Sequence, residues 1–313
     1  MTISGVAAYL DLWAETRGGK AVLVNHSENH TFRIDSPAGT YSLRIHRPGY
    51  QSRPTIESEL NWMTALRRDL DLPIPTPLPG IDGRLLQEID GRHAVLFEHL
   101  PGAEPSPEDE LETVFEILGG FAARMHRHAE GWTPPQGFTR QVWSAAHILD
   151  PDGLWGDWRI APGVSGRIAE IIGRLDTELR LRLDAYGTRP DRFGLIHADM
   201  RLGNLLVDGD RVTLIDFDDC GFCWFAYDFA AAVSFHETLP MVPKLKAAWL
   251  RGYLPIRPLG EEDIAIIDVM VLLRRMALLA WIGSHAETRL AQTHMPGFAE
   301  GTAELAERLL GIR

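Results

Sequence analysis

The chain has 313 residues, 45% of them hydrophobic, which is enough for about two domains of ordinary size. Its 31 basic and 43 acidic residues give a net charge of −12, which argues against nucleic acid or an anionic membrane surface as the main partner. Only two cysteines occur, Cys220 and Cys223, so a disulfide-rich secreted scaffold and an all-cysteine zinc site are both excluded.

Membrane and export signals are weak in this sequence. The N-terminal segment lacks a basic leader, and acidic residues break its apolar run, so it does not resemble a signal peptide. The longest apolar stretch, residues 264–283, contains Asp268 and the pair Arg274 and Arg275, which favours a buried or amphipathic helix over a membrane span. We therefore expect a soluble, cytoplasmic protein.

Short β-rich runs dominate the first hundred residues. Residues 24–35 and 40–47 flank the turn sequence SPAG and predict a hairpin, and further runs follow at 83–89 and 92–100. Between them, residues 53–70 have helical periodicity with Pro54 near the first turn. This part of the chain is expected to form a small antiparallel sheet with one helix.

The second part of the chain is mostly helical. Its first helix is expected to begin at Ser106 and Pro107, because apolar residues recur at helical spacing from Leu111 to Met125. The predicted class is therefore α+β, with an N-terminal lobe over residues 1–100 and a larger helical lobe over residues 101–313.

One β-rich segment, residues 196–217, interrupts the helical part. Two apolar runs flank the turn sequence Asp208-Gly209-Asp210 and predict a hairpin. Polar side chains gather at the two ends of this hairpin: His197, Asp199 and Asn204 precede it, and Asp216 and Asp218 follow it. Hairpin flanks lie close together, so the carboxylate and amide oxygens of these side chains are expected to converge. Such oxygens are the ligands that Mg2+ prefers. Asp199 is left to accept or orient the proton of an attacking hydroxyl, and Arg201 to neutralise charge on a transferring phosphate.

These residues carry a resemblance to a known family. His197-Ala198-Asp199 with Asn204, followed by the IDFD of residues 215–218, resembles the H-x-D-x4-N and D-x-D/E motifs of the aminoglycoside phosphotransferase and choline kinase superfamily. The AYDFA of residues 226–230 is similar to the segment that follows in that family. Finer features, SEN at 27–29, LRIHRPGY at 43–50 and DFDDCGF at 216–222, are similar to bacterial homoserine-kinase-like and stress-response Ser/Thr kinase-like members.

The resemblance implies a bilobal protein-kinase-like fold and a division of roles. Asp199 would be the catalytic aspartate, with Asn204 and Asp216 as metal ligands and Asp218 as an additional carboxylate near a second metal. His197 and Asp228 would brace the catalytic loop by hydrogen bonds. ATP and Mg2+ would be the nucleotide and the metal.

The family also needs a cation on a strand of the first lobe, and here the sequence departs from it. No lysine occurs between Lys20 and Lys244, so Arg44 is expected to hold the α- and β-phosphates. At roughly 100° per residue, Glu59 falls inside the apolar stripe of the helix over residues 53–70, whereas Glu57 falls outside it. A buried carboxylate needs a partner, so an Arg44–Glu59 ion pair is predicted.

Two further nucleotide contacts are expected. A glycine-rich phosphate loop is absent, and Ser27 and Asn29 lie in the turn where small polar groups could cap phosphate oxygens instead. Glu98, His99 and Leu100 stand at the junction of the two lobes, the position of a kinase hinge, where backbone groups would contact the adenine edge.

The favoured function is an ATP- and Mg2+-dependent kinase acting on a small-molecule hydroxyl: an amino alcohol, a hydroxy amino acid or an aminoglycoside-like compound. A Ser/Thr protein kinase is the first alternative, distinguished by an open acidic groove in place of a closed acceptor pocket. The second alternative is a nucleotide-binding module without transfer activity, suggested by the missing lysine and the missing glycine loop.

Overall fold

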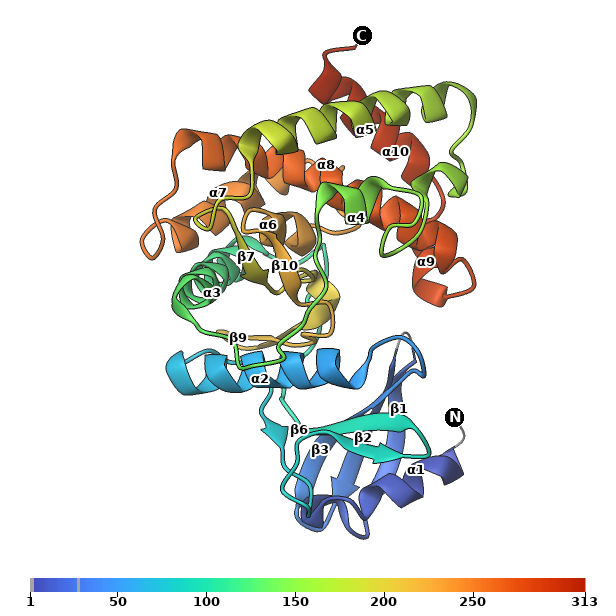
Figure 1. Ribbon diagram of the computed structural model, residues 1–313, viewed down its shortest axis with the longest axis vertical. Helices are drawn as coiled ribbons and strands as arrows, with labels where there is room; N and C mark the ends of the chain where they lie inside the picture. Colours follow the sequence, from blue (N-terminus) through green and yellow to red (C-terminus); the bar gives the residue numbers. More distant parts are fainter. Residues whose placement is uncertain (1–2, 27–28, 313) are drawn as a thin grey trace. The chain divides into compact units, whose positions relative to one another are not determined.

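The computed structural model describes residues 3–26 and 29–312, and the chain forms two compact units (Figure 1). Unit 1 runs to Ala103 and also includes Thr133–Arg140 and Leu206–Asp218. Unit 2 consists of Glu104–Trp132, Gln141–Leu205 and the chain from Asp219 onward. The predicted α+β, bilobal class is confirmed, and two segments distant in sequence fold with the N-terminal residues.

Unit 1 is built on an antiparallel sheet in the order β1-β2-β3-β6-β4, with β5 also paired to β6. The strands are β1 (Lys20–His26), β2 (Asn29–Ser36), β3 (Gly39–His46), β4 (Pro77–Leu78), β5 (Gln87–Ile89) and β6 (Arg92–Glu98).

Alternation along the strands gives the sheet two different faces. Leu43 lies opposite Leu96, and both are fully buried in a cluster with Val6 and Tyr9 of α1 (Ile3–Leu10). A short helix, η1 (Ala14–Thr16), follows α1. Arg44, the next residue of β3, therefore points to the other face. The sheet thus has an apolar face against α1 and a second face that carries the arginine.

The helix predicted over residues 53–70 is present as α2 (Arg53–Asp69). Ser52 caps it, since its side chain accepts a 3.4 Å hydrogen bond from the Thr55 amide, and Pro54 occupies its first turn. Its apolar stripe is buried together with Glu59, which is fully buried. The helical phase therefore placed the correct glutamate on the inner side.

The predicted hairpin is present as β8 (Leu205–Asp208) and β9 (Arg211–Leu214), joined at Gly209 with φ 59°. The amide of Leu214 donates to the carbonyl of Pro73 at 3.1 Å, and Val207 bridges to Ala103. These contacts explain why residues 206–218 belong to unit 1.

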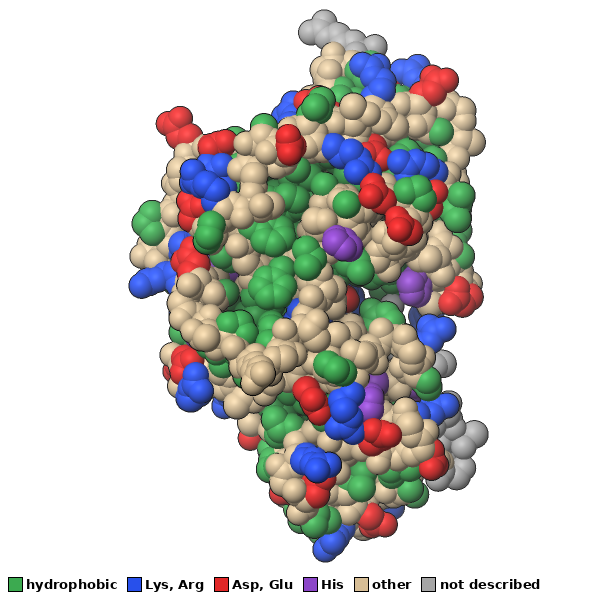
Figure 2. Space-filling model, in the orientation of Figure 1, with side chains coloured by type: hydrophobic (Ala, Val, Ile, Leu, Met, Phe, Trp, Pro, Cys, Tyr) green, Lys and Arg blue, Asp and Glu red, His purple; other side chains and the backbone are tan. Residues whose placement is uncertain are grey.

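Unit 2 surrounds one long buried helix, α8 (Glu261–Ser284), in which most residues from Ile266 to Ile282 are buried. The other elements are α3 (Glu112–Gly131), α4 (Ala145–Leu149), η2 (Trp158–Ile160), α5 (Gly166–Tyr186), β7 (Phe193–Ile196), η3 (Leu202–Asn204), β10 (Gly221–Trp224), α6 (Tyr227–Ala232), α7 (Val242–Tyr253), α9 (Arg289–His294) and α10 (Phe298–Leu310). β7 and β10 pair antiparallel. On the face shown in Figure 2, basic and acidic side chains are interspersed.

The start of α3 differs from the prediction: the helix begins at Glu112, not at Ser106. The Asp109 carboxylate accepts a 2.7 Å hydrogen bond from the Ser106 amide, which forms a separate turn before the helix. Helical spacing of apolar residues could not reveal this local competition.

The helix over the apolar stretch at 264–283 is buried inside unit 2, and among the described helices none is long and apolar enough to cross a bilayer. Cys220 and Cys223 are both buried, and neither forms a disulfide.

Candidate active site

The segment after β7 is held by Asp228 of α6. The Asp228 Oδ1 atom accepts a 2.7 Å hydrogen bond from the Ala198 amide, and its Oδ2 atom accepts one of 3.4 Å from the His197 amide. The His197 Nδ1 atom in turn accepts a 3.2 Å hydrogen bond from the Asp199 amide. These are bracing contacts of the kind predicted for His197 and Asp228. They hold Ala198 in a left-handed conformation, φ 65°, which is uncommon for a residue with a side chain.

A buried histidine of α3 contacts the Asp228 carboxylate. His126 of α3 contacts Asp228 Oδ2 through Nε2 at 3.0 Å and the Tyr253 hydroxyl through Nδ1 at 2.8 Å. Burial lowers the pKa of His126 despite the nearby Asp228 carboxylate, so the ring is neutral near pH 7. A neutral ring can donate from Nε2 to Asp228 and accept at Nδ1 from Tyr253.

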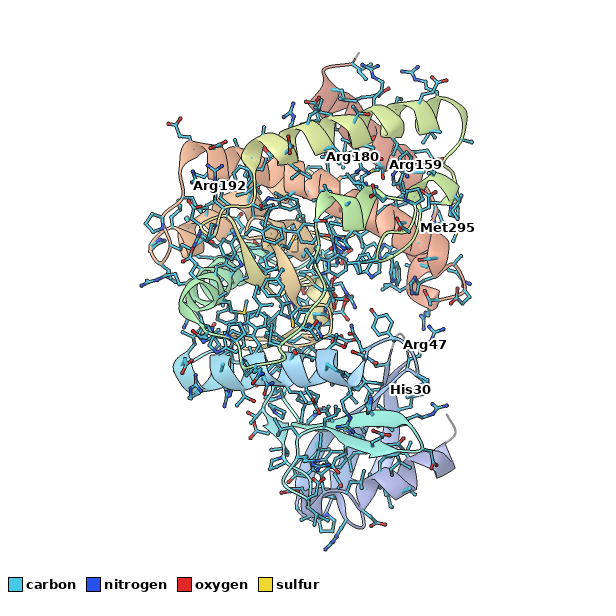
Figure 3. The ribbon with its side chains drawn as sticks, in the orientation of Figure 1. His30, Arg47, Arg159, Arg180, Arg192 and Met295 are labelled. Carbon is cyan, nitrogen blue, oxygen red and sulfur yellow. The ribbon has the colours of Figure 1, made fainter. Side chains whose placement is uncertain are left out.

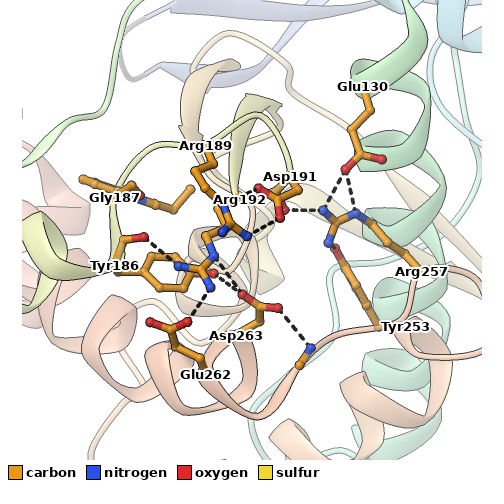
Figure 4. Close-up of polar contacts among 12 residues, drawn as sticks. Glu130, Tyr186, Gly187, Arg189, Asp191, Arg192, Tyr253, Arg257, Glu262 and Asp263 are labelled. Carbon is orange, nitrogen blue, oxygen red and sulfur yellow. Dashed lines mark hydrogen bonds and ion pairs between the residues drawn. The ribbon is translucent and has the colours of Figure 1, made fainter.

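The chain of contacts continues from Tyr253 to an ion pair, shown in Figure 4. Arg257 donates to the Tyr253 hydroxyl at 3.2 Å and to the Glu130 carboxylate at 2.7 Å. His126 and Glu130 are four residues apart on α3, whereas Tyr253 ends α7 and Arg257 lies in the turn that follows it. One pair on α3 therefore contacts a second pair at the end of α7 and in the turn after it.

Asp199 is the most heavily contacted carboxylate of this segment. Its Oδ1 atom accepts a hydrogen bond from Arg274 Nη2, and its Oδ2 atom accepts one from Asn204 Nδ2 at 2.6 Å and one from Arg201 Nε at 3.3 Å. Burial raises the pKa of the Asp199 carboxyl, but the charges of Arg274, Arg201 and His197 outweigh it, so the pKa lies below its usual value. The side chain is thus an oriented carboxylate.

Arg274, on α8, is a residue that motif reasoning did not assign to the site. Its side chain is 1% exposed, and besides Asp199 it donates to the Ala198 carbonyl at 3.2 Å and to the Ser234 hydroxyl at 2.9 Å. Its guanidinium also lies 5.0 Å from the ring centroid of Trp155. The sequence signal that could have indicated Arg274 is the pair of adjacent arginines inside an apolar helix, because each buried charge requires a partner.

Asn204 and Gly203 show how the end of this segment is shaped. The Asn204 amide nitrogen also donates to the Asp199 carbonyl at 2.9 Å, which leaves the amide oxygen as the atom for a cation. A Cβ atom at Gly203 would lie 2.1 Å from Nη1 of Arg201, so glycine at this position lets Arg201 lie across the loop toward Asp199.

In unit 1 the predicted ion pair between β3 and α2 is confirmed. Arg44 Nη2 lies 2.7 Å from Glu59 Oε1, with the two side chains 8% and 0% exposed. Burial disfavours the charge on Arg44, but Glu59, Asp218 and Asp216 outweigh it and raise its pKa. Burial likewise raises the pKa of Glu59, although Arg44 opposes this. The remaining Nη1 atom lies 3.5 Å from Asp216 Oδ1.

Asp216 and Asp218, which follow β9, differ in exposure. Asp216 has φ 62° and a side chain that is 45% exposed. Asp218 is buried: its Oδ2 atom accepts a 2.9 Å hydrogen bond from Asn29 Nδ2, and its Oδ1 atom has no hydrogen-bond partner within the described part of the chain. Arg140 donates to the Asp218 carbonyl and, at 2.9 Å, to the carbonyl of Thr55. A buried carboxylate oxygen without a donor is suited to a cation or an ordered water.

The other nucleotide contacts predicted from the sequence remain predictions. Ser27 lies outside the described residues. The side chain of Asn29 contacts Asp218, so any phosphate contact would fall to other groups of the turn. In the expected hinge, the Glu98 amide already donates to the Thr76 carbonyl at 3.1 Å, and His99 Nδ1 lies 3.4 Å from the Ser42 hydroxyl. Leu100 follows in irregular structure and is half-buried.

These donors fit a hard divalent cation. Amide and carboxylate oxygens are the ligands that Mg2+ accepts, with water and phosphate completing its coordination. Among the described residues no three His, Cys, Asp or Glu side chains gather into a metal site of their own. A cation would therefore need further ligands, such as an amide oxygen, water or the phosphate oxygens of a nucleotide.

Comparison with known proteins identifies the family. The model of the phosphotransferase enzyme family matches residues 21–262. The chain belongs to this family. The resemblance drawn from the motifs is thereby confirmed, and the protein is a kinase-type phosphotransferase. An amicoumacin kinase of Bacillus subtilis (strain 168) is 25% identical over 267 residues, covering 80% of this chain and 76% of the relative. A homoserine kinase of Methylobacillus flagellatus is 28% identical over 286 residues, covering 88% and 80%.

Two solved structures are similar over nearly the whole chain. A microcompartment-associated aminopropanol kinase is 40% identical with a TM-score of 0.91, and the match covers 99% of this chain and 98% of that one. An amicoumacin kinase in complex with AMP-PNP, Ca2+ and Ami has a TM-score of 0.78 at 19% identity, covering 97% and 94%. The second likeness is one of fold. All the relatives and structures named here are kinases, which does not favour the alternative of a nucleotide-binding module without transfer activity.

Proposed function

We propose that the protein is an ATP- and Mg2+-dependent kinase that transfers the γ-phosphate of ATP to the hydroxyl group of a short amino alcohol. The observation that carries the acceptor class is the 40% identity, over 99% of the chain, to an aminopropanol kinase. The chemistry itself is argued from the residues of the two units, because similarity alone assigns no role to a side chain.

The second face of the sheet in unit 1 supports nucleotide binding. Arg44 supplies a permanent positive charge for phosphate oxygens. Strand pairing places Val22, Arg33, Ser42 and Phe97 in one row on this same face, and Val22 is 46% exposed. An exposed apolar side chain on the same face as a phosphate-binding cation suits an adenine ring, which is flat and weakly polar.

The metal would be held by Asn204 and Asp216, with Asp218 as a further carboxylate. When bound, Mg2+ would neutralise charge on the phosphate oxygens. Arg44 would contribute a second positive charge on the nucleotide, and Glu59 keeps that arginine in place.

Asp199 would orient the acceptor. A carboxylate with a lowered pKa is a weak base, so its main effect would be to hold the acceptor hydroxyl by a hydrogen bond and to take its proton as the new O–P bond forms. The oxygen leaving the γ-phosphorus remains on ADP, so the transfer is balanced without a covalent enzyme intermediate. Arg201, beside Asp199, would neutralise charge on the transferring group.

A coupled ADP-release assay tests the proposal, with 1-amino-2-propanol, 2-aminoethanol, homoserine, an aminoglycoside and a generic protein as acceptors. We expect turnover that needs both Mg2+ and an amino alcohol. Homoserine as the preferred acceptor would move the proposal to hydroxy amino acids, the class named for one relative. The proposal would be contradicted if the generic protein were the only acceptor phosphorylated. It would also be contradicted if no acceptor of the panel supported turnover.

Replacing the proposed catalytic aspartate tests the mechanism. Asp199→Asn keeps the shape of the side chain but removes its charge, so turnover should fall by about 10²–10⁴ while ATP binding, measured by calorimetry, stays within about twofold. Asp268→Asn is the matched control, because that carboxylate pairs with Lys246 on the surface and is 69% exposed. Unchanged turnover in Asp199→Asn would remove this residue from the mechanism.

A further inference from the structure

The turn between α6 and α7 contains a strained aromatic residue. Within the described residues, four non-glycine residues have positive φ angles: Asp90, Ala198, Asp216 and Phe235. Ala198 and Asp216 belong to the motifs discussed above. Phe235, with φ 70°, is the bulkiest of the four, and a left-handed backbone is a genuine outlier for such a residue. Strain of this kind persists where the surroundings enforce it, often beside a functional site.

Two adjacent arginines of α8 enforce this conformation. Arg274 donates through Nε to the Ser234 hydroxyl at 2.9 Å, directly before Phe235. Arg275 forms a buried ion pair with Glu237 at 2.6 Å, and the other oxygen of Glu237 accepts a 3.1 Å hydrogen bond from the Phe235 amide. The turn is therefore fixed on both sides of Phe235.

The same arginine pair connects this turn to the proposed catalytic aspartate. Arg274 uses one guanidinium for both Ser234 and Asp199, so the turn and the carboxylate are held to one rigid group. Arg275 also donates to the Phe298 carbonyl at 3.1 Å, which fixes the start of α10 to the same helix. All of these residues belong to unit 2. The position of the Phe235 ring is thus set relative to Asp199 by contacts within one unit.

Aromatic side chains of two helices pack against the half-buried Phe235 ring. His294 of α9 stacks on it with a centroid distance of 4.1 Å, and Trp281 of α8 meets it edge-on at 6.1 Å. Met295, labelled in Figure 3, directly follows His294 and marks the end of α9. Burial lowers the pKa of His294, and the positive charges of His236 and Arg201 lower it further. The stacked imidazole is therefore uncharged near pH 7, and it lies within electrostatic reach of the arginine that contacts Asp199.

We propose that Phe235 is a specificity-determining residue of the acceptor site, with His294 and Trp281 completing an aromatic wall for the hydrocarbon part of a short cationic amino alcohol. This inference rests on the proposed function. Such an acceptor has very little apolar surface, so selection among its homologues requires a ring held in one position before binding. The electron-rich faces of these rings would also attract an ammonium group.

The test compares acceptors of increasing length: 2-aminoethanol, 1-amino-2-propanol and 1-amino-2-butanol. Phe235→Gly removes the ring and suits the left-handed backbone, and Phe235→Leu keeps apolar volume without the stacking. For Phe235→Gly we expect the ratio of kcat/KM between the best and the other amino alcohols to change by about tenfold or more, with a smaller change for Phe235→Leu. The KM for ATP should stay within about twofold for both variants.

A matched control is available in the same unit. Trp132 stacks on His128 at 5.9 Å, as Phe235 stacks on His294, so Trp132→Leu removes a similar contact without touching the proposed wall. It should leave the acceptor ratios unchanged. His294→Leu tests the wall from α9 and should change the same ratios, which keeps the inference testable should the Phe235 variants fail to fold in thermal denaturation.

The outcomes separate this inference from the proposed function. Should the wild type phosphorylate amino alcohols while the Phe235 and His294 variants keep its acceptor ratios, the inference is overturned and the proposed function stands. Equal losses for every acceptor, together with a raised KM for ATP, would assign the ring a purely structural role and also overturn it. A wild type without turnover on any amino alcohol would reject the proposed function, and the inference with it.

Discussion

At the scale of single residues, Arg44 pairs with Glu59 and is the proposed substitute for the strand lysine expected from the family. Glu59 is completely buried, so removal of its partner leaves an uncompensated carboxylate. We expect Arg44→Ala to lower the free energy of unfolding by about 3–5 kcal/mol, measured by urea denaturation, and to raise the KM for ATP by about tenfold or more. Arg44→Lys should retain part of both properties, because it keeps the charge but loses the forked donor geometry.

A second variant separates the two roles of Arg44. Arg53 of the same helix pairs with Glu57 and with Glu88 of β5 at exposed positions, so Arg53→Ala removes ion pairs from a solvated environment. That change should alter stability by less than about 1 kcal/mol and leave the KM for ATP unmoved. If Arg44→Ala destabilises the protein but binds ATP normally, the arginine serves the fold alone.

The site residues that sequence reasoning found share a property: their partners follow from short-range periodicity or from a motif. The family resemblance called for a helix glutamate and helical phase selected Glu59 over Glu57, whereas the motif spacing indicated Asp199 with Asn204. Arg274 and His126 were missed because their partners lie 75 and 102 residues away in sequence. No local pattern specifies such a contact, although a charge within a buried helix indicates that some partner exists.

At the scale of elements, the close contact between α3 and α7 brings His126 and Tyr253 together. Both helices carry glycine at the contact: a Cβ atom at Gly252 would lie 1.8 Å from the Glu116 carbonyl oxygen, and one at Gly119 would lie 2.1 Å from that of Trp249. Because backbone atoms cannot give way as side chains can, Gly252→Ala should lower the free energy of unfolding by about 1–3 kcal/mol or more and reduce kcat through the Asp228 support. Chemical denaturation and steady-state kinetics measure the two effects.

The control for this substitution is another helical glycine with open space around it. Gly173 lies within α5, and a Cβ atom there would meet no heavy atom within 4 Å. Gly173→Ala should therefore stabilise the protein by about 0.5–1 kcal/mol through the lower entropy of the unfolded chain. Equal effects of the two substitutions on the free energy of unfolding would show that α3 and α7 can move apart without loss of stability.

Elements were predictable to different degrees for physical reasons. The helix over residues 53–69 and the hairpin at 205–214 have strong local signals, a capped amphipathic stripe and an Asp-Gly turn, and both predictions are confirmed. The predicted start of α3 was wrong because the Asp109 carboxylate bonds to the Ser106 amide. The membership of residues 206–218 in unit 1 depends on pairing with Pro73 and Ala103, which no local pattern specifies.

For the whole molecule, buried histidines link stability to pH. Burial, together with the charge of Arg44, lowers the pKa of His46 to about 3, although Asp218 opposes this shift. An unfolded histidine has a pKa of about 6.5, so below that pH the unfolded chain binds a proton that the folded chain excludes. Stability should therefore be highest above about pH 6.5 and fall steadily toward pH 3.

Urea denaturation at pH 7.5, 6.5 and 5.5 tests this dependence above the range in which most carboxylates titrate. His46→Leu removes the titrating ring, so its free energy of unfolding should fall less than that of the wild type, by up to about 1.4 kcal/mol per pH unit below pH 6.5. Other groups contribute equally to both proteins, so the difference between their slopes isolates His46. His147→Gln, a change at an exposed histidine, should reproduce the wild-type slope. Parallel curves for wild type and His46→Leu would show that His46 accepts a proton as readily in the folded protein as in the unfolded chain.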